Sequence, residues 1–295
     1  MISLRVAPGR ASSGRHFVYH ARTLRGETLK LLSFLLYVLA SAAGGVLVGL
    51  IGTGSSLVVL PSLALIFASV LEGHDTLRFA AGTTMAAMAV GAIAGALTQY
   101  RAGHVDLRLF RWTLAPYVVG ALIGPWISRL LPSRFLGAYV AIIIVVVALR
   151  LLFEYRAAPR SPRAYVAYRL EITAVLASIA IFSSIAGVAS GIFAIPYLVA
   201  RFSLPIRTII GTSTAGAAVY STFGAIGYVS AGWSATNLPA NSLGYVYLPA
   251  FVIMAITASV CTPLGVRLAS YVNERMLRQV FAIFLIVAAI AIILS

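Results

Sequence analysis

Two matching stretches hold the residues whose types and spacing are best suited to binding chemistry. We call residues 52–61 break 1 and residues 187–196 break 2. Both begin with glycine, continue through small residues that include a serine, and end with four apolar residues and a proline. Small residues inside a long apolar region predict an interrupted helix, whose freed backbone groups a bilayer interior cannot satisfy. Such an interruption is tolerated where it is buried in protein or lines a wet cavity.

A helix that restarts at Ser55 or at Ser190 would present free N–H groups and the positive end of its dipole. With serine and threonine hydroxyls nearby, these groups form an anion site that needs no buried cation. Close helix packing is the alternative explanation for small residues, and we prefer it for the pairs Gly45/Gly49, Gly91/Gly95 and Gly120/Gly124. The predicted substrate-binding residues are Gly52, Gly54, Ser55, Ser56, Thr83, Thr84, Gly187, Ser190, Gly191, Thr212 and Ser213.

The composition predicts an all-α polytopic membrane protein. Of the 295 residues, 61% are hydrophobic and only 10% are charged, whereas soluble domains have about 25% charged residues. The apolar runs are long and continuous, which favours spanning helices over the short alternating strands of a barrel. The predicted segments are 31–51, 55–70, 79–100, 112–127, 135–153, 172–186, 190–202, 206–229, 245–268 and 276–294.

The order of the motifs repeats along the chain. Break 2 follows break 1 by 135 residues, and residues 210–213 match residues 81–84 at an offset of 129. The pairs Pro125/Pro263 and Arg129/Arg267 recur at an offset of 138. Several matches in one order indicate a duplication. We therefore predict a basic tail at 1–30, a first transmembrane repeat at 31–153, a cytoplasmic linker at 154–171 and a second repeat at 172–295.

The arginines predict the topology. The loops 101–111, 150–171, 201–207 and 267–278 hold 13 arginines, whereas the opposite loops hold only Arg78, Arg129 and Arg134. The first set is therefore assigned to the cytoplasm. Because each half has five segments, an odd number, the two halves have opposite orientations in the membrane. This predicts inverted repeats with broken helices near the membrane midplane. Ten full crossings would place the basic tail outside, against the same rule. The sequence therefore leaves open whether nine or ten segments cross the membrane and on which side the tail lies.

Other functions fit the residues less well. The net charge of +15 does not indicate nucleic-acid binding, because the arginines punctuate apolar spans. All seven acids fall in loops or near span ends. For Glu72/Asp75 and Asp106 we therefore prefer solvated loops to the alternative of a proton relay. The histidines form no metal-binding pattern. A serine hydrolase of the rhomboid type would need a base near Ser190, and no histidine lies in an apolar span. We therefore expect neither an enzyme nor a cofactor.

The residues of the two breaks resemble the sulfite exporter TauE/SafE family of membrane transporters. The family carries a glycine-rich segment followed by apolar residues and proline, as at 52–61, and then a small-Gly-Thr-Ser/Thr stretch, as at 81–84 and 210–213. The resemblance covers roughly residues 31–294. It implies a multi-pass protein of a bacterial inner membrane that moves small sulfur-containing anions, such as sulfite or organosulfonates. We expect an exporter that works by alternating access, with a channel-like anion pore as the alternative. The expected partners are the anion, the lipid bilayer and a second copy in a homodimer.

Overall fold

The structure is a computed structural model, and it describes residues 32–50, 55–71, 75–152, 168–202, 204–236, 238–268, 286 and 290. Two compact units make up the chain, Met1–Leu36 and Tyr37–Ser295, and the contacts reported below belong to the second. The predicted tail at 1–30 and the glycines of break 1, Gly52 and Gly54, lie outside the described residues. So does the predicted segment 276–294, apart from two isolated positions.

The described chain is helical, as the composition predicts. Its elements are the helix Leu32–Leu50, α2 (Ser55–Val70), α3 (Thr76–Arg101), α4 (Leu107–Leu130), α5 (Ser133–Leu152), α6 (Arg169–Ala186), α7 (Gly191–Arg201), α8 (Ile206–Gly232), β1 (Ser242–Leu243), β2 (Val246–Tyr247) and α9 (Leu248–Leu268). Leu32–Leu50, α3, α6 and α9 are long and apolar enough to cross a bilayer. The nine predicted segments that fall on described residues each correspond to one of these helices.

Several predicted boundaries are wrong, and the largest error is at α4, which begins at Leu107 rather than at 112. Helix α3 begins at Thr76 rather than at 79, because the Asp75 carbonyl accepts the first helical N–H groups, so Arg78 belongs to a helix and not to a loop. Helix α6 begins at Arg169, inside the predicted linker 154–171. Helix α9 begins at Leu248 rather than at 245, because residues 245–247 complete a hairpin in which β1 pairs antiparallel with β2.

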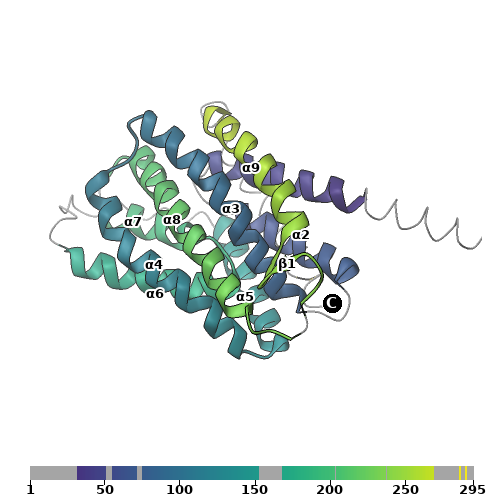
Figure 1. The fold of residues 1–295 in the computed structure, drawn as a ribbon. Helices are drawn as coiled ribbons and strands as arrows, with labels where there is room; N and C mark the ends of the chain where they lie inside the picture. The colour runs from purple at the N-terminus through teal and green to yellow at the C-terminus, as the bar shows by residue number, and fades with distance from the viewer. Residues whose placement is uncertain are drawn as a thin grey trace, which may run out of the picture. The chain divides into compact units, whose positions relative to one another are not determined.

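Helices α3 and α8 lie alongside each other at the centre of the packing (Figure 1). Helix α3 also packs against α2 and α9, and α8 also packs against α4 and α7. The contacts of α3 and α8 pair Gly95 with Thr214 and Met85 with Gly224. The residue numbers change in opposite directions, so these two central helices are antiparallel.

The three small-residue pairs pack against neighbouring helices, as predicted. Gly45 and Gly49 lie against α9, where Gly91 and Gly95 also make contact. On the other side, a Cβ added to Gly120 would lie 2.5 Å from the Cβ of Ala180, and one added to Gly124 would lie 2.5 Å from that of Ser184. These glycines therefore allow close approach of helices. Along the contact of Gly45 and Gly49 with α9, and along that of Gly120 and Gly124 with α6, the residue numbers of the two helices rise together. The helix Leu32–Leu50 therefore runs parallel to α9, and α4 runs parallel to α6.

Two helical hairpins carry the breaks. In the first, the rings of Tyr37 and Phe67 stand 6.3 Å apart, so Tyr37 lies close to the last turn of α2. In the second, Arg201 at the end of α7 forms a two-pronged ion pair with Glu171 at the start of α6, with both N···O distances 2.8 Å. In the second hairpin this ion pair closes the end opposite to the turn at break 2.

Candidate anion site at the meeting of the two breaks

Break 2 is a real interruption. Helix α6 ends at Ala186 because Gly187 adopts a left-handed backbone with φ of 72°. The N–H of Gly187 donates to the Ser184 carbonyl and that of Val188 to the Ser183 carbonyl, at 3.1 and 2.9 Å. This arrangement is a common way to satisfy the last carbonyls of a helix. The chain then restarts as α7 at Gly191.

Two buried tyrosines of α8 satisfy the carbonyls that the interruption leaves. The Tyr220 hydroxyl donates to the Val188 carbonyl at 2.8 Å. The Tyr228 hydroxyl lies within hydrogen-bond distance of the carbonyls of Ser184 and Ile185, at 2.9 and 3.1 Å. Sequence reasoning missed both residues, because a tyrosine in an apolar span looks like a packing residue. Their hydroxyls satisfy acceptors, so the groups that break 2 leaves available are donors.

The two breaks meet. The N–H of Ala189 in break 2 donates to the hydroxyl oxygen of Ser56 in break 1 at 2.8 Å, and both residues are buried. Ser56 is the second residue of α2, which begins at Ser55 as predicted. In the described residues this is the only bond recorded for the Ser56 hydroxyl, and the serine accepts it, so the hydroxyl hydrogen can be donated elsewhere.

The first turn of α7 adds further donors. The N–H groups of Ile192, Phe193 and Ala194 bond to carbonyls at the helix start. Among the described residues, no bond is recorded for the N–H groups of Ser190 and Gly191. The Ser190 hydroxyl is fully buried and makes no hydrogen bond with any residue that the structure describes, although the Tyr117 hydroxyl approaches it. The site thus combines two backbone and two hydroxyl donors.

The predicted hydroxyls of α3 and α8 divide into two kinds. The oxygens of Thr83 and Thr212 accept backbone N–H groups, from Tyr247 at 3.0 Å and from Asp106 at 2.9 Å. The next residue in each case, Thr84 or Ser213, is buried, and its hydroxyl has no partner in the described part of the chain. The first of each pair is therefore engaged in holding a connecting segment, and the second is free to meet a ligand.

These hydroxyls do not gather at one point. Gly187 of break 2 lies against Ala81 near the start of α3, whereas Gly211 of α8 lies against His104, just beyond the end of α3. The 20 residues from Ala81 to Arg101 span about 30 Å of helix. Thr83 and Thr84 therefore lie near one end of the central pair of helices, and Thr212 and Ser213 lie near the other.

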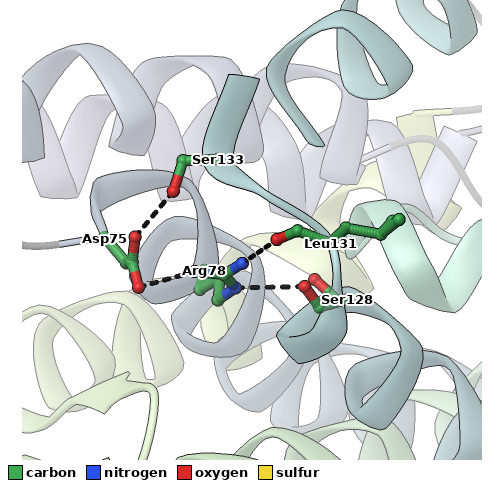
Figure 2. A network of polar contacts seen from close by, with 5 residues as sticks. All are labelled: Asp75, Arg78, Ser128, Leu131 and Ser133. Carbon is green, nitrogen blue, oxygen red and sulfur yellow. Dashed lines mark hydrogen bonds and ion pairs between the residues drawn. The ribbon is translucent and has the colours of Figure 1, made fainter. Parts of the chain in front are cut away.

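A buried arginine lies close to the start of α3 (Figure 2). Arg78 is 6% exposed, and it donates to the carbonyls of Ser128, at 3.1 Å, and of Leu131. It also pairs with the Asp75 carboxylate at 2.6 Å, and Ser133 donates to the other oxygen of that carboxylate at 2.8 Å. A cation at the last carbonyls of α4 complements the helix dipole. Arg78 therefore ties the start of α3 to the α4–α5 connection.

Two other acids have structural partners, whereas Glu72 of the predicted relay lies outside the described residues. The Asp106 carboxylate caps α4 by accepting the N–H groups of Arg108 and Leu109 at 2.9 and 3.0 Å. Glu171 forms the ion pair with Arg201 and accepts the Tyr197 hydroxyl at 3.2 Å. Within the described residues, no group of three or more His, Cys, Asp or Glu side chains is placed to hold a metal ion.

Comparison with known proteins identifies the family. The family model described as "Sulfite exporter TauE/SafE" matches residues 37–292. A "Probable membrane transporter protein" of Haemophilus influenzae is 30% identical over 265 residues, covering 88% of this chain and 98% of the relative. "Probable membrane transporter protein YdhB" of Bacillus subtilis is 26% identical over 212 residues, covering 68% of this chain and 80% of the relative. No solved structure matches. The chain therefore belongs to the sulfite exporter TauE/SafE family and is a multi-pass membrane transporter.

Proposed function

We propose that the protein exports small sulfur-containing anions, such as sulfite or organosulfonates, by alternating access, and that the anion binds where the two breaks meet. The observation that carries the proposal is the bond from the Ala189 N–H to Ser56, which joins break 2 to break 1. Around it, Ser190 and Gly191 supply N–H groups and Ser56 and Ser190 supply hydroxyls. Donors without competing acceptors favour an anion, and the start of α7 adds the positive end of its dipole.

The unpartnered hydroxyls further along the helices support a route through the protein. Thr84 and Ser213 are buried and bond to no residue that the structure describes, which is costly unless a ligand or water uses them in part of a cycle. They lie toward opposite ends of the central pair of helices. An anion leaving the central site toward either end would therefore meet one of these hydroxyls.

Equivalent contacts in the two halves support inverted repeats at 31–153 and 172–295. Gly82 lies against Tyr245 and Gly211 against His104, while Thr83 binds Tyr247 and Thr212 binds Asp106. Adding 129 to the numbers of the α3 residues gives the α8 residues, and adding 141 to the numbers of His104 and Asp106 gives Tyr245 and Tyr247. Each contact in one half therefore has a counterpart in the other half. The close contact of Gly45 with Ala258 likewise corresponds to that of Ala180 with Gly120. Two halves that exchange contacts in this way favour a carrier over a pore, because rocking one against the other exposes a central site to each side in turn.

A flux measurement in liposomes tests the proposal. We expect the purified protein to catalyse saturable uptake of sulfite, competed by at least one of sulfate, thiosulfate, taurine and sulfoacetate. A carrier binds its solute in each cycle, so the rate must level off as the sulfite concentration rises. Flux that rises linearly at single-channel rates would favour the anion pore, and no flux of any of the five solutes would contradict the proposed substrate class.

A further inference from the structure

Two arginines occupy equivalent positions on the central helices. Arg78 lies in the first turn of α3 and Arg207 in the first turn of α8. They are 129 residues apart, which is also the offset between Gly82 and Gly211 and between Thr83 and Thr212. The carbonyl that Arg78 binds belongs to Ser128, whose equivalent at the 138-residue offset of the proline pair is Val266 near the end of α9.

Their surroundings differ sharply. Arg78 is buried and its guanidinium binds two carbonyls at the end of α4 and the Asp75 carboxylate. Arg207 is exposed, and it makes no hydrogen bond or ion pair with any residue that the structure describes. In the described conformation, therefore, Arg78 binds helix-end carbonyls at one end of the central helices, and Arg207 makes no such bond to described residues at the other end.

We propose that Arg207 is a residue of the transport cycle, which binds the last carbonyls of α9 in the opposite state while Arg78 releases those of α4. The inference rests on the proposed alternating access between inverted repeats. In such a carrier the two ends exchange conformations, so an interaction formed at one end now is formed at the other end later. A cation at the end of α9 would gain the same dipole complementarity that Arg78 gains at the end of α4.

Arg207→Gln tests the inference, because in the described state the substitution removes no hydrogen bond or ion pair with a described residue. We expect the melting temperature in detergent to stay unchanged and the maximal rate of sulfite transport to fall by about tenfold, the effect of losing one charge-assisted hydrogen bond. Arg207→Lys should keep most of the rate, since an ammonium group also binds carbonyls. The matched control is Arg108→Gln, an exposed arginine at the same end of the helices, which should transport normally. Equal rates for Arg207→Gln and Arg108→Gln would overturn the inference.

A labelling experiment reads the conformation without transport. Cys261 is the only cysteine, so a Cys261→Ser, Ser128→Cys chain carries one thiol, at a fully buried position beneath Arg78. We expect maleimide labelling to become faster with Asp75→Asn, which removes the ion pair that helps to hold Arg78 in place, and slower with Arg207→Gln, which disfavours the opposite state. Labelling that does not respond to Arg207→Gln would contradict the inference. A protein that labels as expected but moves no sulfite would instead contradict only the proposed substrate.

Discussion

Gly187→Ala is expected to lower the free energy of unfolding by about 2–5 kcal/mol, combining left-handed backbone strain with overpacking. Gly187 has φ of 72°, a conformation that costs a residue with a Cβ about 1–2 kcal/mol. A Cβ there would also overlap Ala81, whose Cα would be only 2.6 Å away. Because α3 and break 2 are both built into the core, neither can move aside cheaply, and transport should be lost together with stability.

Gly103→Ala separates these two causes. Gly103 has φ of 71°, nearly the same as that of Gly187, but an added Cβ would meet nothing within 4 Å. Its replacement should therefore cost only the backbone strain, about 1–2 kcal/mol. The measurement is the apparent stability of both variants in detergent. If the two variants lost the same stability, the tight contact between break 2 and α3 would be disproved.

Gly82→Ala and Gly211→Ala are expected to have large and similar effects. An added Cβ would overlap the carbonyl of Tyr245 in the first case and that of His104 in the second. Each substitution would push away the segment whose N–H is bound by the following threonine, so overpacking and a lost hydrogen bond together cost about 2–4 kcal/mol. Similar losses follow from the equivalence of the two contacts.

Gly137→Ala is the control for this pair. It lies in α5, and an added Cβ would make only ordinary contact, 3.4 Å from the Leu77 side chain. Alanine should be neutral or stabilising there by up to about 1 kcal/mol, since it is the better helix former. The measurement is the melting temperature of each of the three variants, compared with that of the unchanged protein. A tolerated Gly82→Ala beside a damaging Gly211→Ala would contradict equivalent roles for the two glycines.

Much of the fold follows from the sequence, because long apolar runs and small-residue pairs act through general physics. Apolar runs must form helices in a bilayer, and the pairs at Gly45, Gly91 and Gly120 do sit at close helix contacts. The interruption at Gly187 was also predictable, since glycine readily adopts a left-handed backbone. The boundaries at Thr76, Arg169 and Leu248 were not, because capping and hairpin contacts decide them.

The site was only partly predictable. Hydroxyl-bearing residues could be found by type, but the sequence gives no means of separating Thr83 from Thr84. That distinction depends on a backbone N–H that arrives from the other half of the chain, at Tyr247. The roles of Tyr220 and Tyr228 likewise depend on long-range contacts. Arg78 could have been noticed from its match with Arg207 at the 129-residue offset.

The central claim is that backbone and hydroxyl donors at the meeting of the breaks hold the anion, and the sulfite KM of Ser190→Ala tests it most directly. We predict that KM rises about tenfold while the melting temperature does not fall, because the variant removes a hydroxyl that makes no hydrogen bond among the described residues. Ser183→Ala removes another buried, unpartnered hydroxyl at the end of α6, and it should leave KM unchanged. A Ser190→Ala protein with normal KM and normal rate would contradict the account.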